Sequence, residues 1–373
     1  IPDNVTSLGE SIFSGCTLLT SATIGNSVTY IGSYAFSDCS SLVSITIPDS
    51  VISISDFTFF NCSSLESVII GDSVISIGSS AFSGCDNLIQ TENGVSYVNK
   101  WVIDCDESIT NIVLRENIVG IADYAFEDCT FLDSIAIPNG LIFIGNYAFC
   151  GCASLTNIII PNEVISIGDS AFAGCDSLEN ITLPFIGDGN YYTHFGYLFG
   201  ASSHYYNNSY VPQSLKTVTI TGDGIINDFA FEYCTSLTKV IIGDNVSSIG
   251  ESAFNNCTSL TNVIIGDGAI LIGREAFYNC TSLTNLIIGN GVTSLGENAF
   301  WNCTSLESIT MGNSVVSIGR DAFYNCISLT SMTLPNSVAS ISWYAFSNCT
   351  SLTSITIPDK VISIGEGAFK GCT

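Results

Sequence analysis

"NNCTSLTNVIIGDGAILIGREAF" occupies residues 255–277, and "YNCTSLTNLIIGNGVTSLGENAF" follows directly at residues 278–300. Both stretches have the same 23-residue pattern with one cysteine in each. Self-similarity at a fixed period of about 20 to 50 residues is the sequence signature of a solenoid or another repeat array. The pair therefore predicts that the chain folds as a stack of similar coils.

The cysteine carries this period through most of the 373 residues. Fourteen of the 16 cysteines recur at spacings of 23 within three blocks, and we call them the register cysteines: Cys16, Cys39, Cys62 and Cys85; Cys129, Cys152 and Cys175; and Cys234, Cys257, Cys280, Cys303, Cys326, Cys349 and Cys372. Each has a Phe three residues before it, and a Leu three residues after it wherever the chain continues that far. Only Cys105 and Cys150 lie outside the pattern.

One repeat shows what each coil contains. Residues 260–265, "LTNVII", are rich in β-branched side chains and predict a short strand. The "GD" that follows is typical of a turn, and residues 269–273 fit a second short extended piece. "REAFYNC", residues 274–280, suits one helical or 3₁₀ turn. A coil of this size has too small a core to fold alone, so the core forms only when coils stack.

Stacking predicts a ladder of reduced, buried thiols at the register cysteines. The core of a long solenoid is ample, whereas disulfide frameworks belong to small domains with insufficient cores. A free cysteine also behaves as a small buried hydrophobe. A disulfide between Cys105 and Cys150 is a separate possibility. A zinc site is disfavoured because the chain has no Cys-x-x-Cys and only two histidines.

Charge and motifs exclude several function classes. The chain has 34 acidic and eight basic residues, a net charge of −26, which disfavours nucleic acid and anionic membranes as partners. No apolar run reaches the roughly 18 residues that suggest a membrane span. The G-x-S-x-G, H-E-x-x-H and P-loop signatures are missing, so we expect neither an enzyme nor a bound cofactor. Acids recur in the turns, where they either keep the surface soluble or bind divalent cations weakly.

The period breaks twice. Between Cys85 and Cys129 the spacing is 44 residues, and Asn93–Gly94 between "IQTE" and "VSYV" predicts a β-hairpin within an irregular repeat over residues 86–118. We interpret it as a variant of one coil, with a protruding edge for a partner as the alternative.

The second break is an aromatic-rich insertion over residues 184–214, where the cysteine spacing grows to 59. It holds six of the 15 tyrosines and both histidines. Tyrosine with Gly, Ser and Asn is the composition of adaptable binding loops. Two readings stay open, in which these side chains either contact a ligand or fill the gap between coils. The candidate ligand contacts are Tyr191, Tyr192, His194, His204, Tyr205, Tyr206 and Tyr210.

The outward positions of the strands give a second candidate surface. They are mostly Ser, Thr and Asn with little charge, which fits either a strand-compatible soluble face or a hydrogen-bonding surface for proteins or glycans. The candidate contacts there are Thr261, Asn262, Thr284, Asn285, Thr330 and Thr353.

Residues 352–372, "LTSITIPDKVISIGEGAFKGC", resemble the BspA-like leucine-rich repeat family, and the likeness extends over essentially the whole chain. The resemblance implies a right-handed, curved, β-rich leucine-rich repeat solenoid with a parallel sheet. With the repeat pattern, it predicts about 14 coils of 23 residues with short second strands and short helical or 3₁₀ turns. It also implies surface-exposed or secreted proteins, several of them involved in adhesion, and it transfers no catalytic residue.

These observations lead to one functional hypothesis and one rival. We expect residues 1–373 to form a single continuous solenoid that acts as a monomeric, non-enzymatic recognition or adhesion protein outside the cell or on its surface. Its partner would be an extracellular protein or glycan. The chain begins and ends inside repeats, so we expect a fragment of a longer secreted protein. The rival function is a structural spacer, a stiff rod that presents other domains of a larger surface protein.

Overall fold

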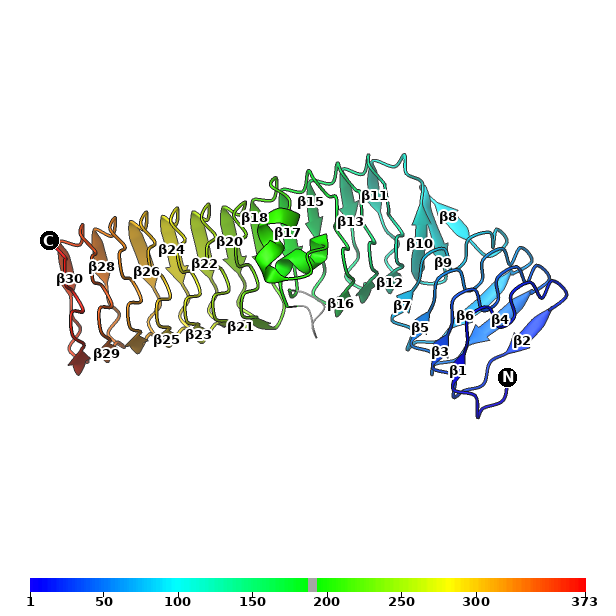
Figure 1. The fold of residues 1–373 in the computed structure, drawn as a ribbon, viewed down its shortest axis with the longest axis horizontal. Coiled ribbons are helices and arrows are strands. Elements are labelled where there is room, and N and C mark those ends of the chain that lie inside the picture. Colours follow the sequence, from blue (N-terminus) through cyan, green and yellow to red (C-terminus); the bar gives the residue numbers. More distant parts are fainter. Residues whose placement is uncertain (187–192) are drawn as a thin grey trace. The chain divides into compact units, whose positions relative to one another are not determined.

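The computed structural model of the protein describes residues 1–186 and 193–373. The chain divides into two compact units, which we call unit 1 (Ile1–Leu155 with Glu163–Cys175) and unit 2 (Thr156–Asn162 with Asp176–Thr373). In both units, successive coils lie side by side with their strands parallel (Figure 1). The predicted parallel β-solenoid is confirmed, with little helix and about 15 turns. That residues 1–373 form one continuous solenoid stays a prediction.

Each regular coil contributes a main strand to a parallel sheet. Main strands pair in register with their counterparts one repeat away, as Val240, Val263 and Leu286 do in unit 2. In unit 1 the main strands are β2 (Ser21–Thr23), β4 (Ser44–Ile47), β6 (Ser67–Ile70), β11 (Asn111–Val113) and β13 (Ser134–Ala136). In unit 2 they are β15 (Asn157–Ile159), β17 (Asn180–Leu183), β18 (Thr217–Ile220), β20 (Lys239–Ile242), β22 (Asn262–Ile265), β24 (Asn285–Ile288), β26 (Ser308–Met311), β28 (Ser331–Thr333) and β30 (Ser354–Thr356).

The predicted second strands also pair in parallel ladders, two in unit 1 and one in unit 2. In unit 1 they are β1 (Ser7–Leu8), β3 (Tyr30–Ile31), β5 (Ser53–Ile54), β7 (Ser76–Ile77), β12 (Gly120–Ile121), β14 (Phe143–Ile144) and β16 (Ser166–Ile167). In unit 2 they are β19 (Gly224–Ile226), β21 (Val246–Ile249), β23 (Leu271–Ile272), β25 (Ser294–Leu295), β27 (Ser317–Ile318), β29 (Ser340–Ile341) and β31 (Ser363–Ile364). The helical elements are η1 (Phe195–Phe199), η2 (His204–Tyr206) and α1 (Asn207–Tyr210).

The core consists of columns of identical side chains that run from coil to coil. Phe254, Phe277 and Phe300 are fully buried, and their rings stack with centroids 4.9 Å and 5.3 Å apart. A spacing of 4.5–7 Å is favourable for aromatic pairs. The separation follows from the roughly 4.8 Å between neighbouring strands. The 23-residue period therefore places each phenylalanine on the equivalent ring of the next coil.

The register cysteines form a second column with a hydrogen-bonding role that burial alone does not predict. The Cys257 thiol donates to the carbonyl oxygen of Phe231 at 3.1 Å, and the Cys280 thiol donates to that of Phe254 at 3.2 Å. In each of these bonds the acceptor is the backbone carbonyl of the Phe that lies three residues before the cysteine of the previous coil. Thiols are weak donors, so each bond is modest. Repeated from coil to coil, the bonds give each of these Phe carbonyls a second donor, besides the backbone N–H of the cysteine in its own coil.

The segment before each cysteine is a run of β-turns, and this corrects the expected helical or 3₁₀ turn. In one coil Ala276 donates its N–H to the Gly273 carbonyl, and Cys280 donates to that of Phe277, both at 3.4 Å. Asn279, immediately before the cysteine, has a φ of 59°, in the left-handed region. A residue with left-handed backbone angles interrupts a helix, and turn positions with these angles favour Gly or Asn. These positions are Asn or Gly in most coils.

The hairpin predicted at Asn93–Gly94 is confirmed. Strands β8 (Gln90–Glu92) and β9 (Val95–Val98) pair antiparallel, and both turn residues have positive φ. A third strand, β10 (Trp101–Cys105), continues antiparallel to β9 and then pairs parallel with β12. The irregular coil therefore leaves the main sheet and joins the second-strand sheet.

The irregular coil also changes the cysteine ladder. Cys105 forms a disulfide with Cys129, so the expectation that every register cysteine is reduced is wrong at Cys129. The alternative pairing with Cys150 is wrong as well, because Cys150 is a free thiol. The reason is position: Cys105 lies 24 residues before Cys129, close to the place where a ladder cysteine of the irregular coil would be. Cys150 lies two residues before Cys152, which occupies the ladder position of its coil.

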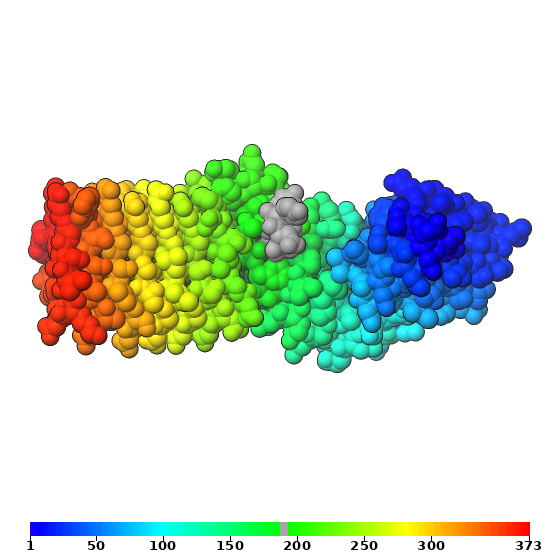
Figure 2. All heavy atoms as spheres, turned by 90° about the horizontal axis from the view of Figure 1, so that it is seen from below, coloured from blue at the N-terminus to red at the C-terminus, as the bar shows by residue number. Residues whose placement is uncertain are grey.

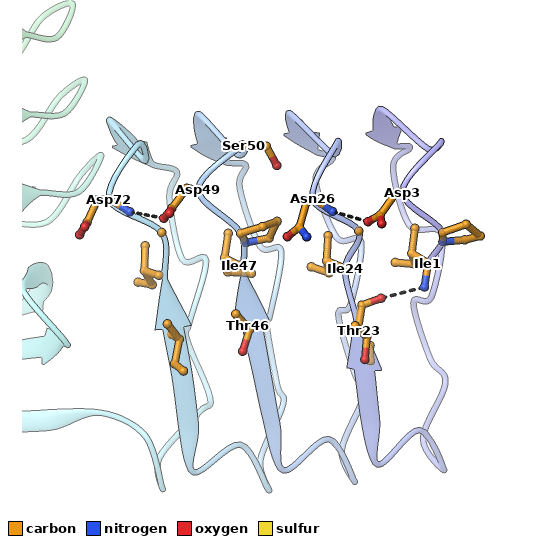
Figure 3. A pocket seen from close by; sticks show the side chains of 17 residues that line it. Ile1, Asp3, Thr23, Ile24, Asn26, Thr46, Ile47, Asp49, Ser50 and Asp72 are labelled. Carbon is orange, nitrogen blue, oxygen red and sulfur yellow. Dashed lines mark hydrogen bonds between the residues drawn. The ribbon is translucent and has the colours of Figure 1, made fainter.

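Aspartate and asparagine side chains link the turns of neighbouring coils. The Asp49 carboxylate accepts the N–H of Asp72 at 3.0 Å, and Asp267 accepts that of Asn290 at 2.6 Å (Figure 3 for Asp49). We call this contact the turn rung. It gives the acids of these turns a structural role, because each carboxylate satisfies a backbone donor one coil away.

Candidate functional site

The aromatic-rich insertion contains a degenerate copy of the repeat. Phe195 lies 23 residues after Phe172, and its ring packs on Phe231 at 4.7 Å between centroids. Its N–H donates to the carbonyl oxygen of Ala230, the alanine that precedes Phe231. The N–H groups of other phenylalanines in the column donate in the same way to the alanine carbonyl of the next coil. Leu198 takes the place of the register cysteine. This part of the insertion therefore fills the core, and the 23-residue spacing from Phe172 was the sequence signal for it.

His194 is part of this core copy. It occupies the position that Ala171 and its equivalents hold elsewhere, and its side chain is only 7% exposed. Burial lowers the pKa of the His194 imidazole, so the ring is held neutral. Both ring nitrogens lack a hydrogen-bond partner within the described parts of the chain. The prediction that His194 contacts a ligand is untested, but burial removes it from the accessible surface.

Asn207 holds the rest of the insertion against the coils. Its side chain is fully buried, and its Oδ1 accepts the N–H of Gly196 at 2.9 Å. Its Nδ2 donates to the carbonyl oxygens of Glu232 at 2.9 Å and Ala230 at 3.3 Å. One amide thus ties α1 to η1 and to the neighbouring coil of unit 2. No sequence pattern predicts this role, because it depends on three separate segments of the chain.

His204 makes a second connection to the same coil. Its Nδ1 lies 2.6 Å from Oε2 of Glu232, a carboxylate that is itself buried, and its ring stacks on Phe229 at 4.9 Å. Asn255 donates to the other carboxylate oxygen of Glu232 at 3.2 Å. Only part of the His204 ring remains accessible, so this residue mainly anchors the insertion.

Three of the predicted contact residues form an exposed aromatic surface on this anchored segment. Tyr205, Tyr206 and Tyr210 are 64%, 52% and 49% exposed. They lie on η2 and α1. These two elements stand out beside the strands of unit 2 in Figure 1, and they are part of the green protrusion at the upper edge of the molecule in Figure 2. We call these three residues the tyrosine surface. Tyr191 and Tyr192 lie outside the described residues.

The second candidate surface lies on strands β22 and β24. Asn262 and Asn285 occupy equivalent positions on these strands and line a shallow cavity of about 250 Å³ with Ile264 and Ile287. Ile287 is 43% exposed, so the depression has an apolar floor with amides along one side. We call this depression the sheet surface.

The threonines beside it have partners inside the solenoid. The Thr261 hydroxyl donates to the Thr238 carbonyl at 2.9 Å, and the Thr284 hydroxyl donates to that of Thr261 at 3.1 Å. These hydroxyls link coil to coil. Thr330 and Thr353 are exposed in later coils and do not line the depression. The structure therefore brings together only part of the predicted set.

Two features are missing from the described residues, 1–186 and 193–373. These residues include no cluster of three or more His, Cys, Asp or Glu side chains arranged to bind a metal ion. None of their helices has the length and hydrophobicity that would let it cross a bilayer.

Comparison with known proteins identifies the family. The BspA type leucine rich repeat region matches residues 1–104, 103–218, 224–349 and 293–373. The chain belongs to this family. Proteins of this repeat class are generally non-enzymatic binding or scaffold proteins. No curated protein matches the chain.

Several solved structures are similar to this chain. A leucine-rich repeat protein from Bacteroides ovatus is 31% identical over 99% of this chain and 80% of its own, with a TM-score of 0.46. A leucine rich cell surface protein from Faecalibacterium prausnitzii is 26% identical over 90% and 87%, with a TM-score of 0.30. The pneumococcal vaccine antigen PcpA is 20% identical over 87% and 83%, with a TM-score of 0.30. The family assignment rests on the repeat region and not on these likenesses.

Proposed function

We propose that this BspA-type protein is a non-enzymatic recognition or adhesion module of the cell surface or extracellular space. It would act as a monomer and bind a protein or glycan through the tyrosine surface, with the sheet surface as a second contact area. The observation that carries the proposal is the pairing of three exposed tyrosines with a buried anchor, Asn207. Tyrosine offers a large, rigid contact area with a polar tip, and anchoring lowers the entropy lost on binding.

The structural spacer remains the second candidate. A spacer needs the stacked core and the turn rungs but has no use for exposed tyrosines on an anchored segment. The two functions therefore differ in how they tolerate substitutions that leave the core intact.

The test is binding of the whole chain to an array of matrix proteins and glycans, with the triple variant Tyr205→Ala/Tyr206→Ala/Tyr210→Ala as the comparison. We expect the variant to lose affinity at least about tenfold, as hot-spot aromatic residues do. The matched control is Tyr30→Ala, a 43% exposed tyrosine in unit 1, which should bind as the unaltered chain does.

A second variant separates the side chains from their anchoring. Asn207→Ala keeps all three tyrosines but removes the buried amide, so the segment should exchange amide hydrogens faster and bind more weakly. Asn208→Ala, at the exposed neighbouring position, should have no effect. Equal binding by the triple variant and the unaltered chain would shift recognition to the sheet surface. No binding by any of them would favour the spacer.

A further inference from the structure

The main strands of unit 1 belong to two sheets, and the sheet formed by β2, β4 and β6 ends at a strand edge that has no strand partner. Strand β6 pairs parallel with β4 on one side and is the last strand of the order β2-β4-β6. In a regular coil the next main strand would follow 23 residues later, at residues 90–93. Here that segment is β8, which pairs antiparallel with β9. On the edge of β6 that faces away from β4, one hydrogen bond is present within the described residues: the Asn99 side chain donates to the Val68 carbonyl at 2.8 Å.

A cavity of about 600 Å³ lies along this edge. Residues 68–72 of β6 and its turn line one part of it, residues 99–101 and Val119 another, and Ile142 with Phe143 a third. Its volume is in the range of about 300 to 1,000 Å³ that is typical of ligand sites. Ile69 is 61% exposed at the strand, so an occupant would cover apolar surface as well as the strand edge.

The turn that follows β6 also has an unused acceptor. Asp72 donates its N–H to Asp49, which completes one turn rung. In the regular coils, the corresponding carboxylate then accepts the N–H of the next coil, as Asp244 does from Asp267 at 2.9 Å. The Asp72 carboxylate accepts no such bond from the part of the chain that the structure describes. Figure 3 shows its side chain on the side of the turn away from Asp49.

Lys100 supplies the remaining recognition element. It is exposed, it lines the same cavity, and it forms no ion pair within residues 1–186 and 193–373. In a chain with a net charge of −26, an unpaired ammonium at a groove is a local site for a carboxylate.

We propose that this groove binds an extended peptide segment of a partner protein, added parallel to β6 as the strand that the irregular coil leaves out. The segment has β-branched apolar residues and then a turn with an acidic residue, whose N–H donates to Asp72 and whose carboxylate faces Lys100. Addition of a strand to a sheet edge is a common mode of peptide recognition. The groove lies in unit 1 and is separate from the tyrosine surface, so either proposal can fail without the other.

The chain's own repeat provides the probe. Residues 260–268, "LTNVIIGDG", form a main strand with its turn. In the folded chain, the backbone N–H of Asp267 in this stretch donates to the carboxylate of the preceding coil and so completes a turn rung. A fluorescently labelled peptide of this sequence should bind the whole chain in an anisotropy titration. A scrambled peptide should not bind. Hydrogen exchange of residues 67–72 should slow when the peptide is present.

A double-substitution cycle tests the rung itself. Asp72→Ala in the protein and N-methylation of Asp267 in the peptide should each weaken binding about tenfold, since each removes the same charge-assisted hydrogen bond. Combined, they should cause no further loss. Asp72→Asn keeps an acceptor and should bind nearly as well as the unaltered chain. Asp72 is exposed, and its carboxylate forms no hydrogen bond or ion pair within the described part of the chain, so these variants should fold normally.

Asp359→Ala is the matched control, because Asp359 occupies the equivalent turn of the last coil. It should leave binding unchanged. The proposal is overturned if the peptide does not bind at concentrations up to about 1 mM, which corresponds to about −4 kcal/mol. It is also overturned if Asp72→Ala binds normally, or if Asp359→Ala is the variant that loses affinity.

Discussion

The register cysteine illustrates how one residue serves two needs of a stacked core. It is small enough to fill the column, and its thiol reaches the Phe carbonyl of the preceding coil at 3.0–3.3 Å. Burial raises the pKa of the Cys303 and Cys349 thiols from the ordinary 9.0 to about 12. The protonated form that donates the hydrogen bond is therefore also the form that the core favours.

This pKa shift predicts that the protein loses stability in alkali. A thiol whose pKa is raised by folding contributes its full stability below the unfolded value of about 9 and loses it as the pH rises toward 12. We expect the free energy of unfolding to fall by about 1.4 kcal/mol per pH unit for each such thiol across this window. Urea unfolding at a series of pH values measures the slope.

The variant Cys303→Ala provides the control for the alkaline slope. It should reduce the slope by the contribution of one thiol, while the lost packing and hydrogen bond lower the stability at neutral pH by about 1–3 kcal/mol. An unchanged slope would show that tyrosine or lysine ionisation, and not the thiol ladder, causes the alkaline loss.

At the scale of the element, the separation between coils leaves no room for side chains at certain positions. A Cβ added at Gly289 would meet the carbonyl oxygen of Gly266 in the neighbouring turn. Backbone cannot yield in the way that a flexible side chain does. The glycine after the main strand in these coils is therefore explained by close approach of two turns.

We predict that Gly289→Ala destabilises unit 2 by about 1–3 kcal/mol, the usual cost of overpacking a well-packed site. Gly9→Ala is the matched substitution, because a Cβ at Gly9 meets nothing within 4 Å. Urea unfolding of the two variants measures the difference. Equal stability of both would mean that the turns move apart at little cost.

At the scale of the whole molecule, acidic residues dominate the surface. With 34 acidic and eight basic residues, the folded chain holds many like charges close together, and this repulsion opposes the compact state. Salt screens such interactions, with a Debye length near 8 Å at physiological ionic strength.

We therefore predict that raising NaCl from about 20 mM to about 500 mM increases the melting temperature by a few degrees. MgCl₂ at the same ionic strength should give a similar increase, because carboxylates such as Asp49 and Asp267 already accept backbone N–H groups. Differential scanning calorimetry measures both. A much larger increase with Mg²⁺ would instead support cation binding along the acidic rows.

The solenoid, its columns of Phe, Leu and Cys, and the hairpin at Asn93–Gly94 could all be predicted from the amino-acid pattern. The solenoid and its columns follow from a local pattern that repeats every 23 residues, so copying the pattern also copies the contacts between neighbouring coils. The hairpin follows from the local Asn-Gly turn signal. The Asn before the cysteine could have been interpreted in the same way, as a left-handed turn residue and not part of a helix.

Where the period breaks, the contacts could not be predicted and become visible only in the folded protein. The Cys105–Cys129 disulfide, the Asn207 anchor and the open edge of β6 depend on segments that meet without a fixed spacing along the chain. A repeat predicts its own neighbours because equivalent residues stack on one another. Outside the copied stretch around Phe195, the insertion has no equivalent residue in the next coil, so its partners are determined by packing in three dimensions.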